Sequence, residues 1–168
     1  RDFQVEGMSI GDSLLDFFSI TEIKSGKRNY YKQKDYIPVW IKSSKFNNYQ
    51  GVQFHYKNLN NKYIIEGLEG IIYYKNNMKD CYKKLDEIDK VISESFPSLK
   101  RDDGGIEKHP ADKTGKSTSK KILYWFENND LMFVKCFDWT DEMKYADHLR
   151  VGLKTNNLNQ WYKIAYDD

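Results

Sequence analysis

The feature that most constrains this fold is one apolar stripe within residues 77–96, NMKDCYKKLDEIDKVISESF. Its large apolar side chains recur at spacings of four, three, four and four, at Cys81, Leu85, Ile88, Ile92 and Phe96. This spacing places them on one face of an α-helix, and charged residues fill the opposite face. Asn77 can cap such a helix and Pro97 ends it. The pattern predicts a long helix over 78–96 that packs against a core.

Strand-like segments, rich in β-branched and aromatic residues, lie on both sides of this helix in the sequence. They are residues 36–42, 51–57 and 62–75 before the helix and 121–127, 131–139 and 147–154 after it. Residues 51–57 alternate apolar and polar side chains, which indicates one buried and one solvated face. We therefore predict an α+β fold, an antiparallel sheet of about six strands packed against the helix 78–96. One sheet and two stacked three-stranded halves both fit this order.

Short helices are expected at both ends of the chain. Two precede the first strand, over 10–18 and from Ser19 to Gly26, because each begins with a serine followed three residues later by an acid. One follows the last strand, over 156–164. The long segment 98–121 is polar and is predicted to be a loop.

The element order predicts a single domain over 1–168. The order is helix, three strands, helix, three strands, helix, so one α-βββ unit is used twice, over 9–75 and 78–154. The chain of 168 residues is long enough for one ordinary core.

Composition narrows the classes of partner. The 27 basic and 25 acidic residues give a net charge of +2, so we expect no nucleic-acid partner. The apolar runs are far shorter than a membrane-spanning helix requires, so we expect no membrane span. The abundance of Lys, Asn, Tyr and Ile is typical of an AT-rich genome.

The two cysteines, Cys81 and Cys136, leave two alternatives open. Both fall on apolar faces, where they are either a disulfide or two buried thiols. A bridge would close a loop of about 55 residues and stabilise the fold by about 4 kcal/mol in the chain-entropy model. Because the chain starts at Arg1 rather than Met, we expect that a preceding segment was removed. That segment was either an export signal cleaved in the cell or residues omitted when the chain was chosen.

No segment carries a catalytic or cofactor signature. Gly115-Lys116-Ser117 resembles the end of a phosphate-binding loop, but Pro110 stands where the first glycine is needed and a strand follows. The three histidines are far apart and lack metal-ligand spacing, and His55 falls on the solvated face of its strand. We therefore predict no metal, no cofactor and no catalytic residue.

One group of residues is a candidate ligand site. His148, Asp138 and Trp139 lie near the ends of two predicted strands, where a pocket between sheet and helix would bring them together. A small-ligand-binding protein or a hydrolase would use such a pocket.

Three segments carry a resemblance over most of the chain: VEGMSIGDSLLDFFS at 5–19, DCYKKLDEI at 80–88 and CFDWTDEM at 136–143. The chain resembles a group of uncharacterised exported proteins of AT-rich marine alphaproteobacteria. That group has no assigned activity, so the resemblance implies a source and an exported location.

The first predicted helix carries a second resemblance. Gly7-Met8-Ser9, Asp12 and Leu14-Leu15 are similar to the opening of the small outer-membrane assembly lipoproteins, which resemble β-lactamase-inhibitor-like folds. Ser13 and Asp16 depart from that family's pattern, and no lipidated cysteine stands near the start. The resemblance implies paired helices on an antiparallel sheet and binding to other proteins.

Together these observations predict a non-catalytic protein, periplasmic or secreted, that acts as a protein-interaction or envelope-assembly module with an unidentified protein partner. The alternative is the small-ligand binder or hydrolase. An exposed apolar patch would favour the first function, and a deep pocket with converging polar groups would favour the second.

Overall fold

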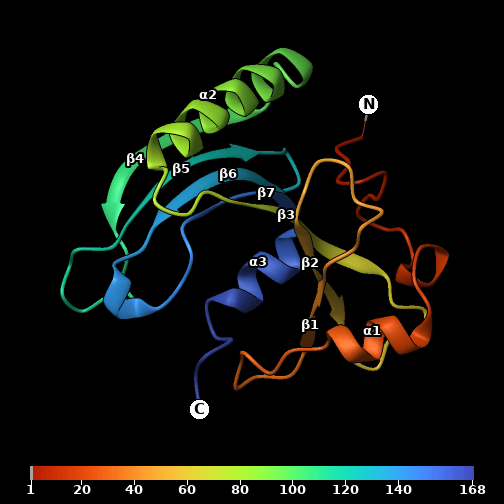
Figure 1. The fold of residues 1–168 in the computed structure, drawn as a ribbon. Coiled ribbons are helices and arrows are strands. Elements are labelled where there is room, and N and C mark those ends of the chain that lie inside the picture. Colours follow the sequence, from red (N-terminus) through yellow and green to blue (C-terminus); the bar gives the residue numbers. More distant parts are fainter. Residues whose placement is uncertain (1) are drawn as a thin grey trace.

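A computed structural model describes residues 2–168 and contains one antiparallel sheet of seven strands, in the order β1-β2-β3-β7-β6-β5-β4 (Figure 1). The strands are β1 (Tyr36–Ile41), β2 (Gly51–Lys57), β3 (Ile65–Tyr73), β4 (Lys100–Lys108), β5 (Thr118–Trp125), β6 (Leu131–Asp138) and β7 (His148–Lys154). The α-helices are α1 (Ile20–Gly26), α2 (Met78–Ser95) and α3 (Asn156–Tyr162), and the 3₁₀ turns are η1 (Leu14–Asp16) and η2 (Asp141–Met143).

Strand β7 joins the two groups of strands into one sheet. It pairs with β3 on one side and β6 on the other, so Gly152 lies opposite both Glu69 and Phe133. The predicted α+β class with an antiparallel sheet is confirmed, and the alternative of two stacked halves is wrong. Segments 9–75 and 78–154 contribute three and four strands to this sheet.

The predicted loop 98–121 is wrong over much of its length. Residues 100–108 form β4, which pairs with β5 at the edge of the sheet, and only 109–117 connect the two strands. Most β4 side chains are exposed, so the strand shows no buried alternation in its sequence. Charged residues of this kind are typical of edge strands, where they discourage pairing with another chain.

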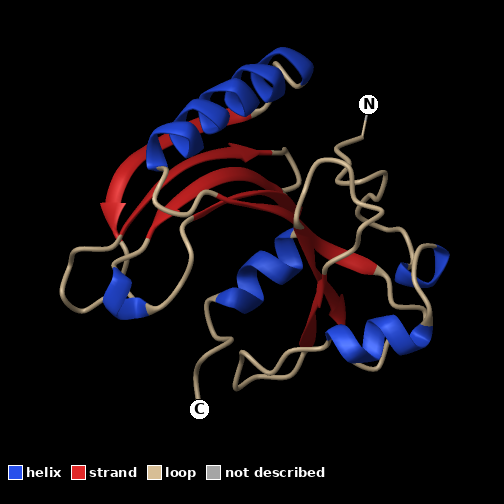
Figure 2. Cartoon of the chain, viewed as in Figure 1, coloured by secondary structure: helices blue, strands red, loops and turns tan. Residues whose placement is uncertain are grey.

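Helix α2 covers one face of β5, β6 and β7, as Figure 2 shows. Its predicted stripe is confirmed, since Cys81, Leu85 and Ile92 are buried there. Asn77 caps the helix through its side chain, which accepts from the backbone of Asp80. Cys81 is joined by a disulfide to Cys136 of β6. The structure thus has the bridged alternative, across the interface between helix and sheet.

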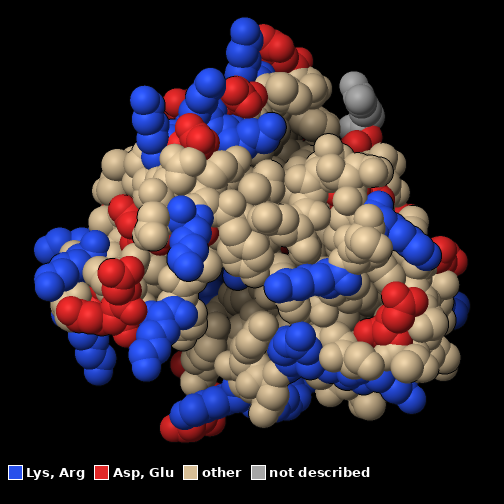
Figure 3. Space-filling model, viewed as in Figure 1, with Lys and Arg blue, Asp and Glu red and all other residues tan. Residues whose placement is uncertain are grey.

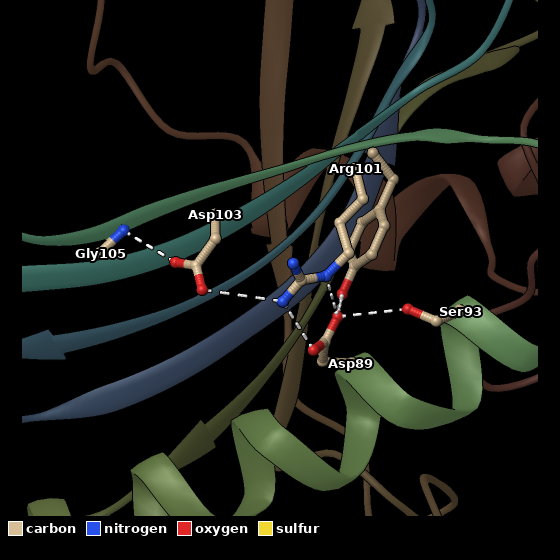
Figure 4. Close-up of polar contacts among 6 residues, drawn as sticks. Asp89, Ser93, Arg101, Asp103 and Gly105 are labelled. Carbon is tan, nitrogen blue, oxygen red and sulfur yellow. Dashed lines mark hydrogen bonds and ion pairs between the residues drawn. The ribbon is translucent and has the colours of Figure 1, made fainter.

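A polar clamp also holds α2 to the edge of the sheet (Figure 4). Arg101 of β4 donates from Nε and Nη2 to the two carboxylate oxygens of Asp89, both across 2.9 Å. Tyr124 of β5 donates to the same carboxylate across 2.6 Å. These bonds hold the pKa of Asp89 below its ordinary value, with Arg101 the largest cause. The clamp therefore depends on an ionised Asp89.

The N-terminal helices differ from each other. Over 10–18 only the 3₁₀ turn η1 forms, so the predicted first helix is wrong. Gly11 has φ +93°, and its N–H donates to Ile65 rather than within a helix. The second helix is confirmed as α1, with a complete capping box between Ser19 and Glu22.

Helix α3 lies against the sheet face opposite α2, beneath the curved strands in Figure 1. Leu158 of α3 packs directly on Gly67, where a Cβ would approach its Cδ2 to 2.5 Å. The same helix covers His55, which is only 1% exposed. The prediction that His55 faces solvent is therefore wrong, because α3 packs on the face of β2 that the alternation of residues 51–57 assigns to solvent.

Candidate functional site: an aromatic cleft with an arginine in its floor

A cleft of about 770 Å³ opens on the sheet face opposite α2. Strands β2, β3, β6 and β7 supply its floor, through Gln53, Ile71, Phe137 and Arg150. Aromatic side chains from the connections and the chain end form much of its rim, among them Tyr31, Trp139, Tyr145 and Tyr166. In Figure 3 a recess lies beneath the curved part of the sheet, and basic side chains border it. A cleft is present near His148, but the prediction that it lies between the sheet and the long helix is wrong, because no residue of α2 lines it.

Arg150 is held on two sides in this floor. Its Nε donates to Nε2 of His148 across 3.0 Å, and its Nη1 donates to Oε2 of Glu69 across 3.0 Å. Glu69 is 9% exposed, and it is ionised because Arg150 lowers its pKa against the effect of burial. The guanidinium is therefore fixed in orientation while its remaining N–H groups stay free of these two contacts.

His148 is neutral in this arrangement. Its Nδ1 lies 2.8 Å from the carbonyl oxygen of Ala146, which can only accept, so Nδ1 carries the proton. Its Nε2 accepts the hydrogen bond from Nε of Arg150 and therefore carries no proton of its own. Burial, and next the charge of Arg150, lower the pKa of His148 to about 4. Both ring nitrogens are occupied, so His148 positions Arg150 and is no free base.

Aromatic rings stack outward from His148 along one wall. His148 stacks on Phe137 at 4.8 Å between centroids, and Phe137 lies parallel to Trp139 at 6.0 Å. His109 and Tyr145 contact Trp139 at 4.4 and 4.9 Å. The Nε1 of Trp139 is buried and has no hydrogen-bond partner within residues 2–168. The wall offers ring faces to a planar ligand.

Asp138 is separated from the other two predicted site residues. It follows Phe137 in β6, so its side chain lies on the opposite face of the sheet, toward Tyr82 of α2. Burial and the charge of Asp147 raise its pKa. The structure thus brings His148 and Trp139 to the cleft and excludes Asp138 from it.

The loop that carries His109 is held by one buried carboxylate. Asp112 accepts from the backbone N–H and hydroxyl of Ser117, across 3.0 and 2.6 Å, and from both groups of Thr114. The hydroxyl of Thr140 also donates to Asp112, rather than capping η2. These bonds tie the rim of the cleft to the Trp139 connection and limit its movement.

A neutral hydrogen-bonded cluster lies behind Tyr31 of the rim. The hydroxyls of Tyr31 and Tyr162 lie 2.9 and 2.8 Å from Nε2 of His55. Burial lowers the pKa of His55 to about 4 and raises the pKa values of both tyrosines. The cluster is uncharged at neutral pH and holds Tyr31 and α3 on the sheet.

A second hollow, of about 610 Å³, lies beside the N-terminal segment. Its Glu6 accepts backbone N–H groups of Asn47, Asn48 and Tyr49. That carboxylate is therefore already hydrogen-bonded within the fold.

Sequence reasoning missed Arg150 and Glu69. The available signal was the presence of charged residues, Glu66 and Glu69 in IEGLEGIIY and Arg150 in HLRVGLK, inside two otherwise apolar strand segments. Such residues in strand interiors point to a buried ion pair or a site. Within residues 2–168, no group of three His, Cys, Asp or Glu side chains could hold a metal ion.

No family model matches the chain, and neither a curated protein nor a solved structure matches it. None of the helices within residues 2–168 is both long and apolar enough to span a membrane. The geometry of the cleft is therefore the basis for assigning a function.

Proposed function

We propose that this protein binds a small molecule that combines a ring with an anionic group, and that the cleft over Arg150 is the binding site. The observation that carries the proposal is the guanidinium held between Glu69 and His148. A guanidinium fixed in this way presents its remaining donors to a carboxylate, sulfonate or phosphate at a small entropic cost.

The walls of the cleft support the ring. Phe137, Trp139 and Tyr145 form part of its lining, and apolar faces with a few converging polar groups are typical of small-molecule sites. Ring stacking favours a planar ligand, and Arg150 selects one with negative charge. The occupied nitrogens of His148 favour binding over hydrolysis.

The disulfide supports an exported location. Bridges such as Cys81–Cys136 form and persist in oxidising compartments, so we propose that the protein is periplasmic or secreted. The protein-interaction or envelope-assembly module inferred from sequence remains a prediction, and the cleft favours its small-ligand alternative.

A matched pair of fluorescent probes tests the binding proposal. The anion 1-anilinonaphthalene-8-sulfonate and neutral N-phenyl-1-naphthylamine share the same rings and differ in the sulfonate. We expect the protein to prefer the anion by about tenfold or more, the size of one charge-assisted contact. Fluorescence titration measures both affinities.

The test variant is the double substitution Glu69→Gln/Arg150→Met. It removes both charges together, so neither is left buried without its partner. We expect this variant to lose the preference for the anionic probe. Arg150→Lys keeps the positive charge but not the planar guanidinium with its paired donors, so it should retain part of that preference. Lys83→Met, on the exposed face of α2, is the control. Equal affinities for the two probes in the unaltered protein would refute the proposal.

A further inference from the structure

The sheet face that floors the cleft continues past Arg150 into three more basic side chains, Lys135, Lys154 and Lys121, of which Lys121 is paired with Glu107. Lys135 of β6 lies opposite Arg150 in the register of β6 and β7, and Lys154 ends β7. Strand alternation places Lys135, Arg150 and Lys154 on the same face, opposite α2. The basic strip therefore adjoins the cleft directly.

Carboxylates on this face are already paired with other cations. Glu69 is in contact with Arg150 at 3.0 Å, and Glu107 is in contact with Lys121 at 3.0 Å. No ion pair within residues 2–168 joins Lys135 or Lys154 to a carboxylate at 4.0 Å or less. Among the described residues, the partly buried ammonium groups of Lys135 and Lys154 thus have no carboxylate within ion-pair distance.

Both ammonium groups lie beside the ring of Phe133, and the Nζ of Lys154 lies nearer still to the ring of Tyr162 in α3, at 4.5 Å from its centroid. The Nζ of Lys135 lies 4.6 Å from the centroid of Phe133, and the Nζ of Lys154 lies 5.4 Å from it. Phe133 is 2% exposed, and its ring folds over Gly152, where a Cβ would approach Cζ of Phe133 to 3.0 Å. A rigid apolar surface therefore carries two cations, and the carboxylate whose charge acts on both of them, Glu69, is hydrogen-bonded to Arg150.

Burial of like charges beside one another costs free energy unless an anion compensates them. The surroundings already oppose the charge, since burial and then Lys154 lower the pKa of Lys135 to about 8. Burial likewise lowers the pKa of Lys154. A bound anion would remove this penalty.

We propose that Lys135 and Lys154 form an oxyanion subsite over Phe133, distinct from Arg150 and continuous with the cleft. Its ligand chemistry is a phosphate or sulfate group that accepts hydrogen bonds from both ammonium groups. The inference also has a consequence for the ligand of the cleft, and this consequence rests on the proposed function. That ligand would carry two anionic groups, one bound by Arg150 and one bound by Lys135 and Lys154.

Inorganic phosphate tests the subsite separately from the ring-binding cleft. Isothermal titration at pH 7, with sodium chloride holding the ionic strength constant, measures its affinity for the unaltered protein. We expect binding, and we expect Lys135→Met and Lys154→Met each to weaken it by about tenfold or more. Lys83→Met is the control and should bind phosphate like the unaltered protein. Methionine keeps an apolar stem and removes the buried charge, so both variants should fold.

The double substitution Glu69→Gln/Arg150→Met separates the two proposals. We expect it to lose the preference for the sulfonate probe while it still binds phosphate. Loss of phosphate binding in this variant alone, with both lysine variants unaffected, would place the anion on Arg150 and overturn the subsite. Absence of phosphate binding to the unaltered protein would overturn it too.

The unaltered protein offers a readout that needs no substitution. Phosphate should shift the Cε–Hε nuclear magnetic resonance signals of two lysines in preference to the others. A uniform response of all lysines would show only general screening and would overturn the proposal.

Discussion

His148 accepts a hydrogen bond at Nε2 from Nε of Arg150 across 3.0 Å, and this contact fixes the direction of the guanidinium in the cleft floor. The Ala146 carbonyl holds the other ring nitrogen, so the imidazole has one orientation and one tautomer. In the function that we propose, Arg150 contacts the ligand and His148 positions Arg150.

Replacement of His148 should therefore weaken binding of the anionic probe without changing its site. We expect His148→Ala to reduce the preference for 1-anilinonaphthalene-8-sulfonate over N-phenyl-1-naphthylamine by about tenfold, the size of one charge-assisted hydrogen bond. His148→Gln should restore part of it, because its Oε1 can accept near the position of Nε2. Probe titrations give the comparison, and equal losses in both variants would contradict the positioning role.

Acidification should destabilise the fold between pH 7 and pH 5. Burial lowers the folded-state pKa values of His55 and His148 to about 4, below the ordinary value near 6.5. The unfolded chain then binds more protons in this window, so the stability is present above pH 6.5 and is lost as the pH falls toward 4. We expect a loss of roughly 2 kcal/mol per histidine between pH 7 and pH 5.

Urea unfolding at pH 7, 6 and 5 measures this dependence. Most carboxylates stay ionised over that range, so the change isolates the histidines. His55→Gln should flatten the pH dependence. A free energy of unfolding that is constant across the window would contradict the burial of neutral imidazoles.

The disulfide should contribute strongly to stability. Cys81 and Cys136 close a loop with a sequence separation of 55, and the double substitution to serine should cost about 4 kcal/mol in the chain-entropy model. Urea unfolding of both proteins gives the difference. Mass measurement after alkylation, with and without reductant, counts the thiols; two alkylated thiols in unreduced protein would contradict the bridge.

The clamp at Asp89 should hold α2 to the sheet edge. Asp89→Asn removes the charge that Arg101 and Tyr124 contact, and we expect it to lower the free energy of unfolding by about 1–3 kcal/mol. Asp86→Asn, at an exposed position of the same helix, is the matched control and should change it little. Equal effects of the two substitutions would show that the clamp contributes nothing specific.

Local patterns predicted the elements whose hydrogen bonds and buried faces are set within a few residues. The stripe from Cys81 to Ile92 predicted α2, and Ser19 with Glu22 predicted the cap of α1. The same reasoning was wrong at η1, because Gly11 and Leu14 bond to distant residues of the β3 region instead of closing a helical turn. It was also wrong at β4, since an exposed edge strand has no buried face to produce alternation.

The sequence by itself therefore determined the fold class, the long helix, most of the strands and which residues share a strand face. Only the tertiary structure decided which face would be buried and which residues would meet. Arg150 and Glu69 stand 81 positions apart and meet because β7 inserts beside β3. Alternation is a local property of the backbone, whereas strand order and the return of α3 depend on contacts between distant segments. The cleft arises from those distant contacts, and for that reason the sequence did not show that Arg150 meets Glu69 in the floor of a cleft.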